Sequence, residues 1–207
     1  MALFSTLSAG LALALASVAD AKGRRFKELT DADMTDAQRA VHRAIASGPR
    51  GGVRGPFNAL LRSPELADRV QKVGEYVRFR SSLPAPLNEL AILVTARHWG
   101  AQFEWYAHRQ LALAAGLAPA VIDDIAAGKR PSLMSGDEAA VYDFCTELYR
   151  HKQVSDAAYL AVLEKFGERG VVDLIGASGY YSLVSMVLNV ERHPLPEGVA
   201  EPLQPLG

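Results

Sequence analysis

The sequence has almost no cysteine. Cys145 is the single one among 207 residues, so an intramolecular disulfide is excluded, and so is any reaction that needs a CxxC pair. Cys145 lies in AAVYDFCTELYRH, between Phe144 and Leu148 of a run that has the spacing of a helix with one buried face. We therefore expect an inert core thiol at Cys145 rather than a reactive one.

An excess of charge of either sign is also missing. The 22 Lys and Arg residues nearly balance the 23 Asp and Glu residues, and both signs are interspersed along the chain. This balance argues against nucleic acid, or a strongly anionic surface, as the main partner. The length and the 49% hydrophobic content are typical of one domain with a well-buried core.

No apolar run is long enough to cross a membrane. The apolar stretch from Leu7 to Val18 is too short for a bilayer span, and no later segment does better. Residues 19–21, Ala-Asp-Ala, fit a small-x-small cleavage site, so residues 1–21 predict a signal peptide and a periplasmic or secreted protein. Because no Lys or Arg precedes the apolar stretch, the alternative is an N-terminal helix packed on a cytoplasmic domain.

Alternating strand patterns with hairpin turns are absent, whereas alanine, leucine and helix-capping signals are frequent. The sequence therefore predicts an all-α fold with a single helical domain over 22–195. Residues 35–38 and 135–138 fit capping boxes, and Ser63 precedes a proline at a first helical position. The expected helices are 35–46, 64–80, 86–98, 101–115, 119–127, 135–150, 155–167 and 169–191.

Two segments are expected to lack helix. Residues 196–207 form a proline-rich tail, which suggests an extended strap over a neighbouring surface or subunit. Residues 48–57, GPRGGVRGPF, combine four glycines with two arginines, so their backbone amides could approach an anion. No Gly-Lys-Ser/Thr follows as in a P-loop, and a flexible connector or pocket lid is therefore favoured over a phosphate site.

Residues 87–117 carry the side chains best suited to chemistry. Glu89 has apolar neighbours on its expected helix, and it is either a buried site residue or an ordinary first-turn acid favoured by the helix dipole. Glu104 and His108 lie four residues apart and share one helix face. This arrangement suits general acid–base catalysis, although such pairs also occur on exposed surfaces.

The spacing of these residues resembles a known family. The alkylhydroperoxidase D frame has a glutamate, eleven residues, a CxxC, three residues and a histidine, and here Glu89 and His108 fit it with Ala101 and Glu104 at the cysteine positions. The Glu-x-x-x-His pair without cysteines is similar to that of 4-carboxymuconolactone decarboxylases. The chain is thus identified as a member of the carboxymuconolactone decarboxylase and alkylhydroperoxidase D-like family, cysteine-free subgroup, over roughly residues 30–195.

This resemblance implies the helical bundle of that family and a homo-oligomer, either a trimer or a hexamer.

Arg78, Arg80 and Arg97 are candidates for binding a substrate carboxylate, since guanidinium offers a matching fork of donors, and the alternative for each is a surface salt bridge. Arg97 would share the stripe of Glu104 and His108 only if the helix continued through Gly100.

Aromatic residues flank the motif and could either wall a small-molecule pocket or fill the core. Trp105 is the pocket candidate among them; the others are Trp99, Phe103 and Tyr106, with Tyr180 and Tyr181 later in the chain. A metal site built from Glu104, His108 and either His98 or Glu89 is not favoured by the spacing, so no metal is expected.

The function that these residues favour is that of a cofactor-independent, decarboxylase-like lyase or isomerase. Its substrate would be a small carboxylated molecule, and an unsaturated lactone qualifies because it supplies its own electron sink. His108 would deliver a proton while Glu104 or Glu89 orients it. The alternatives are hydroperoxide reduction, the peroxiredoxin-type activity of the family, which lacks its thiol here, and a non-catalytic binding scaffold.

Overall fold

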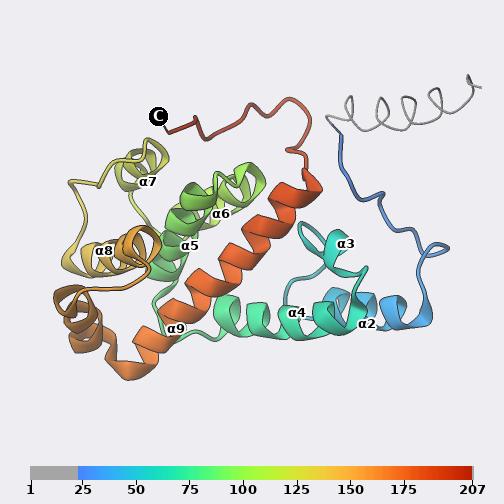
Figure 1. Ribbon diagram of the computed structural model, residues 1–207, viewed down its shortest axis with the longest axis horizontal. Helices are drawn as coiled ribbons and strands as arrows, with labels where there is room; N and C mark the ends of the chain where they lie inside the picture. Colours follow the sequence, from blue (N-terminus) through green and yellow to red (C-terminus); the bar gives the residue numbers. More distant parts are fainter. Residues whose placement is uncertain (1–22, 207) are drawn as a thin grey trace, which may run out of the picture.

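The computed structural model describes residues 23–206, and every regular element among them is an α-helix (Figure 1). The predicted all-α class is therefore confirmed. The predicted signal peptide, residues 1–21, lies outside the described residues. The helices are α2 (Asp36–Ala46), α3 (Phe57–Leu60), α4 (Pro64–Phe79), α5 (Ala85–Trp99), α6 (Gln102–Ala114), α7 (Pro119–Ala126), α8 (Gly136–His151) and α9 (Asp156–Glu191).

Local side-chain hydrogen bonds fix where several helices begin. The hydroxyl of Thr35 accepts a hydrogen bond from the amide of Gln38, whose side chain accepts one from the amide of Thr35 in return. Ser135 and Glu138 form the same capping box before α8. Both boxes were predicted. α4 begins at Pro64 as expected, but the Ser63 side chain makes no capping hydrogen bond.

α9 joins two segments that were expected to be separate helices. It runs from Asp156 to Glu191, and its backbone leaves the helical region at Gly167, with φ 67° and ψ 179°. The two expected helices, 155–167 and 169–191, therefore meet at a kink at Gly167, and α9 denotes both together. α3 was not predicted, because four residues are too few to display a helical period.

α5 is the centre of the core. Leu90, Ile92 and Leu93 on this helix have no exposed surface, and α5 packs against α6, α8 and α9. Figure 1 shows α9 crossing the molecule, with α2, α3 and α4 towards one end and α7 and α8 towards the other. One apolar cluster spans α5 to α8, and a second joins α4 to the later half of α9. The junction of α5, α6 and α9 lies between these clusters.

The C-terminal segment after α9 forms no helix and crosses from the end of α9 towards α7 (Figure 1). The amide nitrogen of Leu203 donates to the Gln102 side chain over 2.9 Å, and the Gln102 side chain donates back to the Leu203 carbonyl over 2.8 Å. Leu203 is buried and Leu206 packs against Gly128. The tail is therefore a strap over helices of its own chain.

The expectation that no segment is long and apolar enough to cross a membrane was wrong for α9, the one helix among the described residues whose length and composition would allow it. In the most apolar part of α9, 56% is buried inside the protein. The core helix of a soluble protein can be equally long and apolar, because a helix packed on several sides is apolar on several sides.

Candidate active site

Three ionisable side chains from two helices meet in the interior. Glu89 comes from α5, and Glu104 and His108 come from α6. His108 Nδ1 lies 2.7 Å from Glu89 Oε2, and His108 Nε2 lies 3.1 Å from Glu104 Oε1. All three residues are buried. The imidazole is thus held at both nitrogens by carboxylates.

The turn between α5 and α6 brings these residues together. α5 ends at Gly100, which takes the left-handed conformation with φ 57° that glycine adopts without strain. The chain then reverses at the buried, extended Ala101, and α6 packs along α5. Because Glu104 and His108 lie one helical turn apart, both can face Glu89 across the two helices.

The surroundings of His108 decide its protonation state. Burial lowers the pKa of this imidazole, but the charges and hydrogen bonds of Glu104 and Glu89 outweigh burial and raise it to about 9. His108 is therefore an imidazolium at neutral pH. The ring of Tyr181 from α9 meets it edge-on at 4.9 Å between centroids. Burial and the nearby carboxylates raise the pKa of Tyr181 well above its usual value, so its hydroxyl stays neutral.

A cavity of about 350 Å³ opens onto this cluster. Glu104 and His108 line it, whereas Glu89 does not. Its wall also includes Phe103, Tyr180 and Tyr181, Arg78 from α4, and the glycine-rich segment after α2. Hollows of about 500 and 830 Å³ lie elsewhere on the chain, but neither reaches the carboxylates or the imidazole. The 350 Å³ cavity is the candidate site because buried ionisable groups, Glu104 and His108, line it.

The three predicted arginines have different surroundings in the structure. Arg78 lines the cavity. Arg80 forms an ion pair with Glu75 over 3.0 Å and is exposed, so its predicted substrate role is not supported by its position. Arg97 lies on α5 and donates to the Gln204 carbonyl of the C-terminal strap over 2.8 Å, away from the cavity. Because α5 ends at the left-handed Gly100, Arg97 and His108 lie on different helices and do not share one helix face as expected.

The aromatic candidates also differ in whether they line the cavity. Trp105 is 1% exposed within the core cluster around α5 and does not line the cavity, so its predicted place in the pocket wall is wrong. Trp105 lies one position beyond Glu104 on α6, which turns it towards a different neighbour. Phe103, Tyr180 and Tyr181 line the cavity instead.

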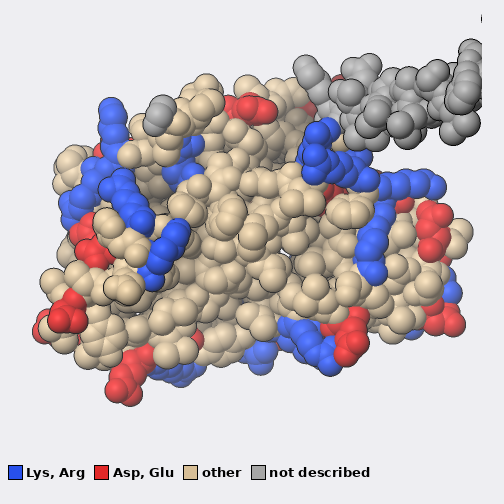
Figure 2. Space-filling model, in the orientation of Figure 1, with Lys and Arg blue, Asp and Glu red and all other residues tan. Residues whose placement is uncertain are grey.

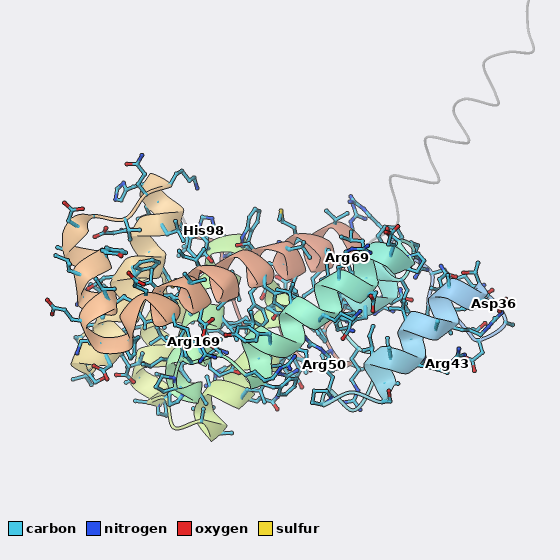
Figure 3. All side chains as sticks on the ribbon, turned by 90° about the horizontal axis from the view of Figure 1, so that it is seen from below. Asp36, Arg43, Arg50, Arg69, His98 and Arg169 are labelled. Atoms are coloured by element: carbon cyan, nitrogen blue, oxygen red, sulfur yellow. The ribbon has the colours of Figure 1, made fainter. Side chains whose placement is uncertain are left out.

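Arg50 and Arg54 are cavity residues that the site prediction missed. Both belong to the segment 48–57, which was expected to be a connector or a lid. The guanidinium of Arg50 donates to the Tyr180 hydroxyl over 3.1 Å and lies 5.1 Å from the centre of the Phe57 ring. Figure 3 shows Arg50 beside α4, with His98 on the other side of α9. The feature of the sequence that pointed to them was the pair of arginines within the glycine-rich segment 48–57.

The remaining reactive groups lie outside the cavity. Cys145 is fully buried, and burial raises the pKa of its thiol to about 12. This agrees with the expected inert thiol. His98 stacks on Tyr149 with 4.5 Å between ring centroids and does not approach His108. Within residues 23–206, no group of three or more His, Cys, Asp or Glu side chains has the arrangement of a metal site.

Comparison with known proteins places the cluster in a family context. Residues 64–144 match the model of the carboxymuconolactone decarboxylase family. A similar solved structure comes from Agrobacterium tumefaciens and is described as a protein of unknown function, provisionally an antioxidant defence protein AhpD. Its TM-score is 0.59 at 17% identity, and the alignment covers 69% of this chain and 99% of that one, which supports the fold. No curated protein matches the sequence.

Proposed function

Because residues 64–144 belong to the carboxymuconolactone decarboxylase family and include Glu89, Glu104 and His108, we propose that the protein is a cofactor-independent lyase or isomerase. Its substrate is a small carboxylated molecule, with unsaturated lactones as the first candidates. Membership supports an enzymatic or antioxidant role at the level of the family. The observation that carries the more specific proposal is His108, held at both ring nitrogens beside a cavity of suitable size.

Each residue of the cluster has a distinct part in this proposal. Glu89, which does not line the cavity, fixes Nδ1 of His108 and so orients the ring. Glu104 lines the cavity and bonds Nε2, so Nε2 is the nitrogen on the cavity side. A proton carried by His108 therefore leaves from Nε2.

The reaction needs only the substrate and one proton from solvent. The bond between the substrate carbon and its carboxylate breaks, carbon dioxide leaves, and the electron pair moves through the conjugated lactone. His108 adds a proton to carbon, and solvent returns a proton to the imidazole. An arginine of the cavity wall, such as Arg78, holds the substrate in place. In an isomerisation, the same imidazole would move a proton between two carbons.

The test is release of carbon dioxide from carboxylated unsaturated lactones by the purified protein. His108→Gln should lower kcat/KM by about 100-fold or more, the usual contribution of a positioned acid. His98→Gln is the matched control, since His98 lies outside the cavity. A His108→Gln enzyme as active as the wild type would refute the assigned role. Absence of turnover by the wild type on every such lactone would refute the lyase proposal.

The geometry gives less support to the two alternatives. Hydroperoxide reduction needs an accessible thiolate, whereas Cys145 is fully buried with a pKa raised to about 12. A purely structural scaffold does not explain why a protonated histidine and Glu104 line a cavity with Glu89 behind them, because buried ionic groups rarely improve stability over apolar ones.

We also propose that the protein forms a homo-oligomer through α9. Several large apolar side chains on this helix are exposed, and their spacing places them along one face: Val172, Ile175, Met186 and Val190. Figure 2 shows that the middle of this view, across which α9 runs in Figure 1, carries few charged residues. A second copy of the chain would cover such a surface.

A further inference from the structure

The segment between α2 and α3 follows a defined path along the cavity. Gly51 and Gly55 have φ of 65° and 62°, a region that side chains larger than glycine rarely enter. A Cβ at Gly55 would make an ordinary contact, 3.5 Å from Phe103, so the positive φ values are what favour glycine in this segment. The turns at these glycines carry Arg50 into the cavity wall.

Arg50 is held by two neighbours without being neutralised by either of them. Tyr180 accepts one of its hydrogen bonds and Phe57 lies below its guanidinium, but neither is charged. The Nε atom of Arg50 is buried and has no hydrogen-bond partner among the described residues. Within residues 23–206, no carboxylate lies within ion-pair distance of Arg50, and Glu104 in the same cavity is bound to His108. A partly buried guanidinium without a charged partner is therefore suited to bind an anionic group of a ligand.

α4 is built to leave room for this arrangement. Gly74 is buried in the middle of α4, where glycine costs about 0.5–1 kcal/mol relative to alanine. A Cβ at this position would overlap both the Tyr180 hydroxyl and the Arg50 guanidinium. The glycine therefore forms a notch into which Tyr180 and Arg50 fit.

We propose that Arg50 is the specificity-determining residue of the cavity, binding the carboxylate of the ligand, and that Tyr180 and the Gly74 notch are its positioning residues. Arg54 and Arg78 line the same cavity and add to its positive potential. The inference rests on the proposed function for the location of the site and for the carboxylate, but not for the reaction that follows binding.

Binding of a matched pair of probes tests this proposal. The probes are 5-oxo-2,5-dihydrofuran-2-acetate and its neutral methyl ester, with dissociation constants measured by calorimetry on the full chain. The wild type should bind the acid more tightly than the ester. Arg50→Gln should weaken binding of the acid by about tenfold or more, as for loss of a charged hydrogen bond, and leave the ester unchanged. Arg50→Lys should restore binding only partly, because it loses the planar fork.

Two further variants separate positioning from folding. Tyr180→Phe removes only the hydroxyl that accepts from Arg50, and Gly74→Ala fills the notch. Each should weaken binding of the acid while leaving binding of the ester unchanged, whereas general damage to the fold would weaken binding of both. Arg80→Gln is the matched control, since Arg80 is an exposed arginine paired with Glu75.

The outcomes distinguish this proposal from the proposed reaction. If Arg50→Gln loses the preference for the acid while no lactone releases carbon dioxide, Arg50 keeps its role and the lyase proposal fails. If Arg50→Gln binds the acid as the wild type does, or loses acid and ester equally, the role of Arg50 is overturned. A wild type without preference for the acid overturns it as well.

Discussion

At His108, burial and charge act on the same proton in opposite directions. Burial alone would favour the neutral imidazole, yet Glu104 and Glu89 raise its pKa to about 9. Desolvation of charges is costly, so the cluster is stable only while each charge keeps its partners. Because Glu104 lines the cavity, a bound ligand can replace one of those partners, which connects the electrostatics of the cluster with its proposed chemistry.

Replacing each carboxylate separately should reveal their unequal effects on His108. Glu104→Gln should lower the His108 pKa more than Glu89→Gln, because the attraction of Glu104 is the largest of the influences that raise it. Titration of ¹⁵N-labelled histidine by NMR measures both values. His98 serves as an internal control and should titrate alike in all three proteins. An unchanged His108 pKa in Glu104→Gln would contradict this account.

Sequence spacing could predict part of this site. The four-residue interval between Glu104 and His108 fixes their common face, and the family frame added Glu89. Arg97 was misplaced because one left-handed residue, Gly100, redirects the chain, and spacing alone does not give that angle. The glycines and arginines of residues 48–57 indicated that an anion could approach this segment, but the place of Arg50 in the cavity depends on Tyr180, 130 residues away, and was not predictable.

Helix α9 shows the same limit at the scale of an element. Helix ends with capping boxes were predictable, because the side chains that satisfy the end amides are close in sequence. The kink at Gly167 was predicted only as a gap between two helices. The direction that the later part takes after the kink depends on its packing against α4 and α5, which local patterns do not contain.

The conformation of Gly167 leads to a prediction about α9. With φ 67° and ψ 179°, this residue occupies a region essentially restricted to glycine, so Gly167→Ala should destabilise the protein by about 1–3 kcal/mol. Gly176→Ala on the same helix is the control: Gly176 has no positive φ, and a Cβ there would make only an ordinary contact, 3.9 Å from Val77. It should be neutral or stabilising by up to about 1 kcal/mol. Urea unfolding measures both, and equal effects would contradict the role of the kink.

For the whole molecule, the apolar stripe on α9 predicts self-association. Ile175 is 49% exposed in the middle of α9, and Ile175→Glu should convert the oligomer into monomers by placing a charge in the interface. Leu133→Glu is the control, because Leu133 is 73% exposed in the loop between α7 and α8. Sedimentation velocity distinguishes the species. A wild type that sediments as a monomer at micromolar concentration would refute this assembly.

The stability of the whole molecule should depend on pH through His108. Its pKa is about 9 in the folded state and about 6.5 when unfolded, so the folded state binds the proton more tightly. The stabilisation is complete below pH 6.5 and is lost as pH rises towards 9, by up to about 3 kcal/mol. The charged groups that set this behaviour are Glu104 on its own helix and Glu89 on α5, with the neutral Tyr181 on α9 against the ring.

Removing both carboxylates should reverse the sign of this dependence. In the Glu89→Gln/Glu104→Gln variant, burial is the main remaining influence, and it holds the folded pKa of His108 below 6.5. The unfolded state then binds the proton more tightly, so stability should increase as pH rises to 6.5 and stay level between pH 7 and 9. Urea unfolding of both proteins at pH 5, 7 and 9 measures the difference. Parallel pH profiles would show that His108 does not carry the charge that the proposed mechanism requires.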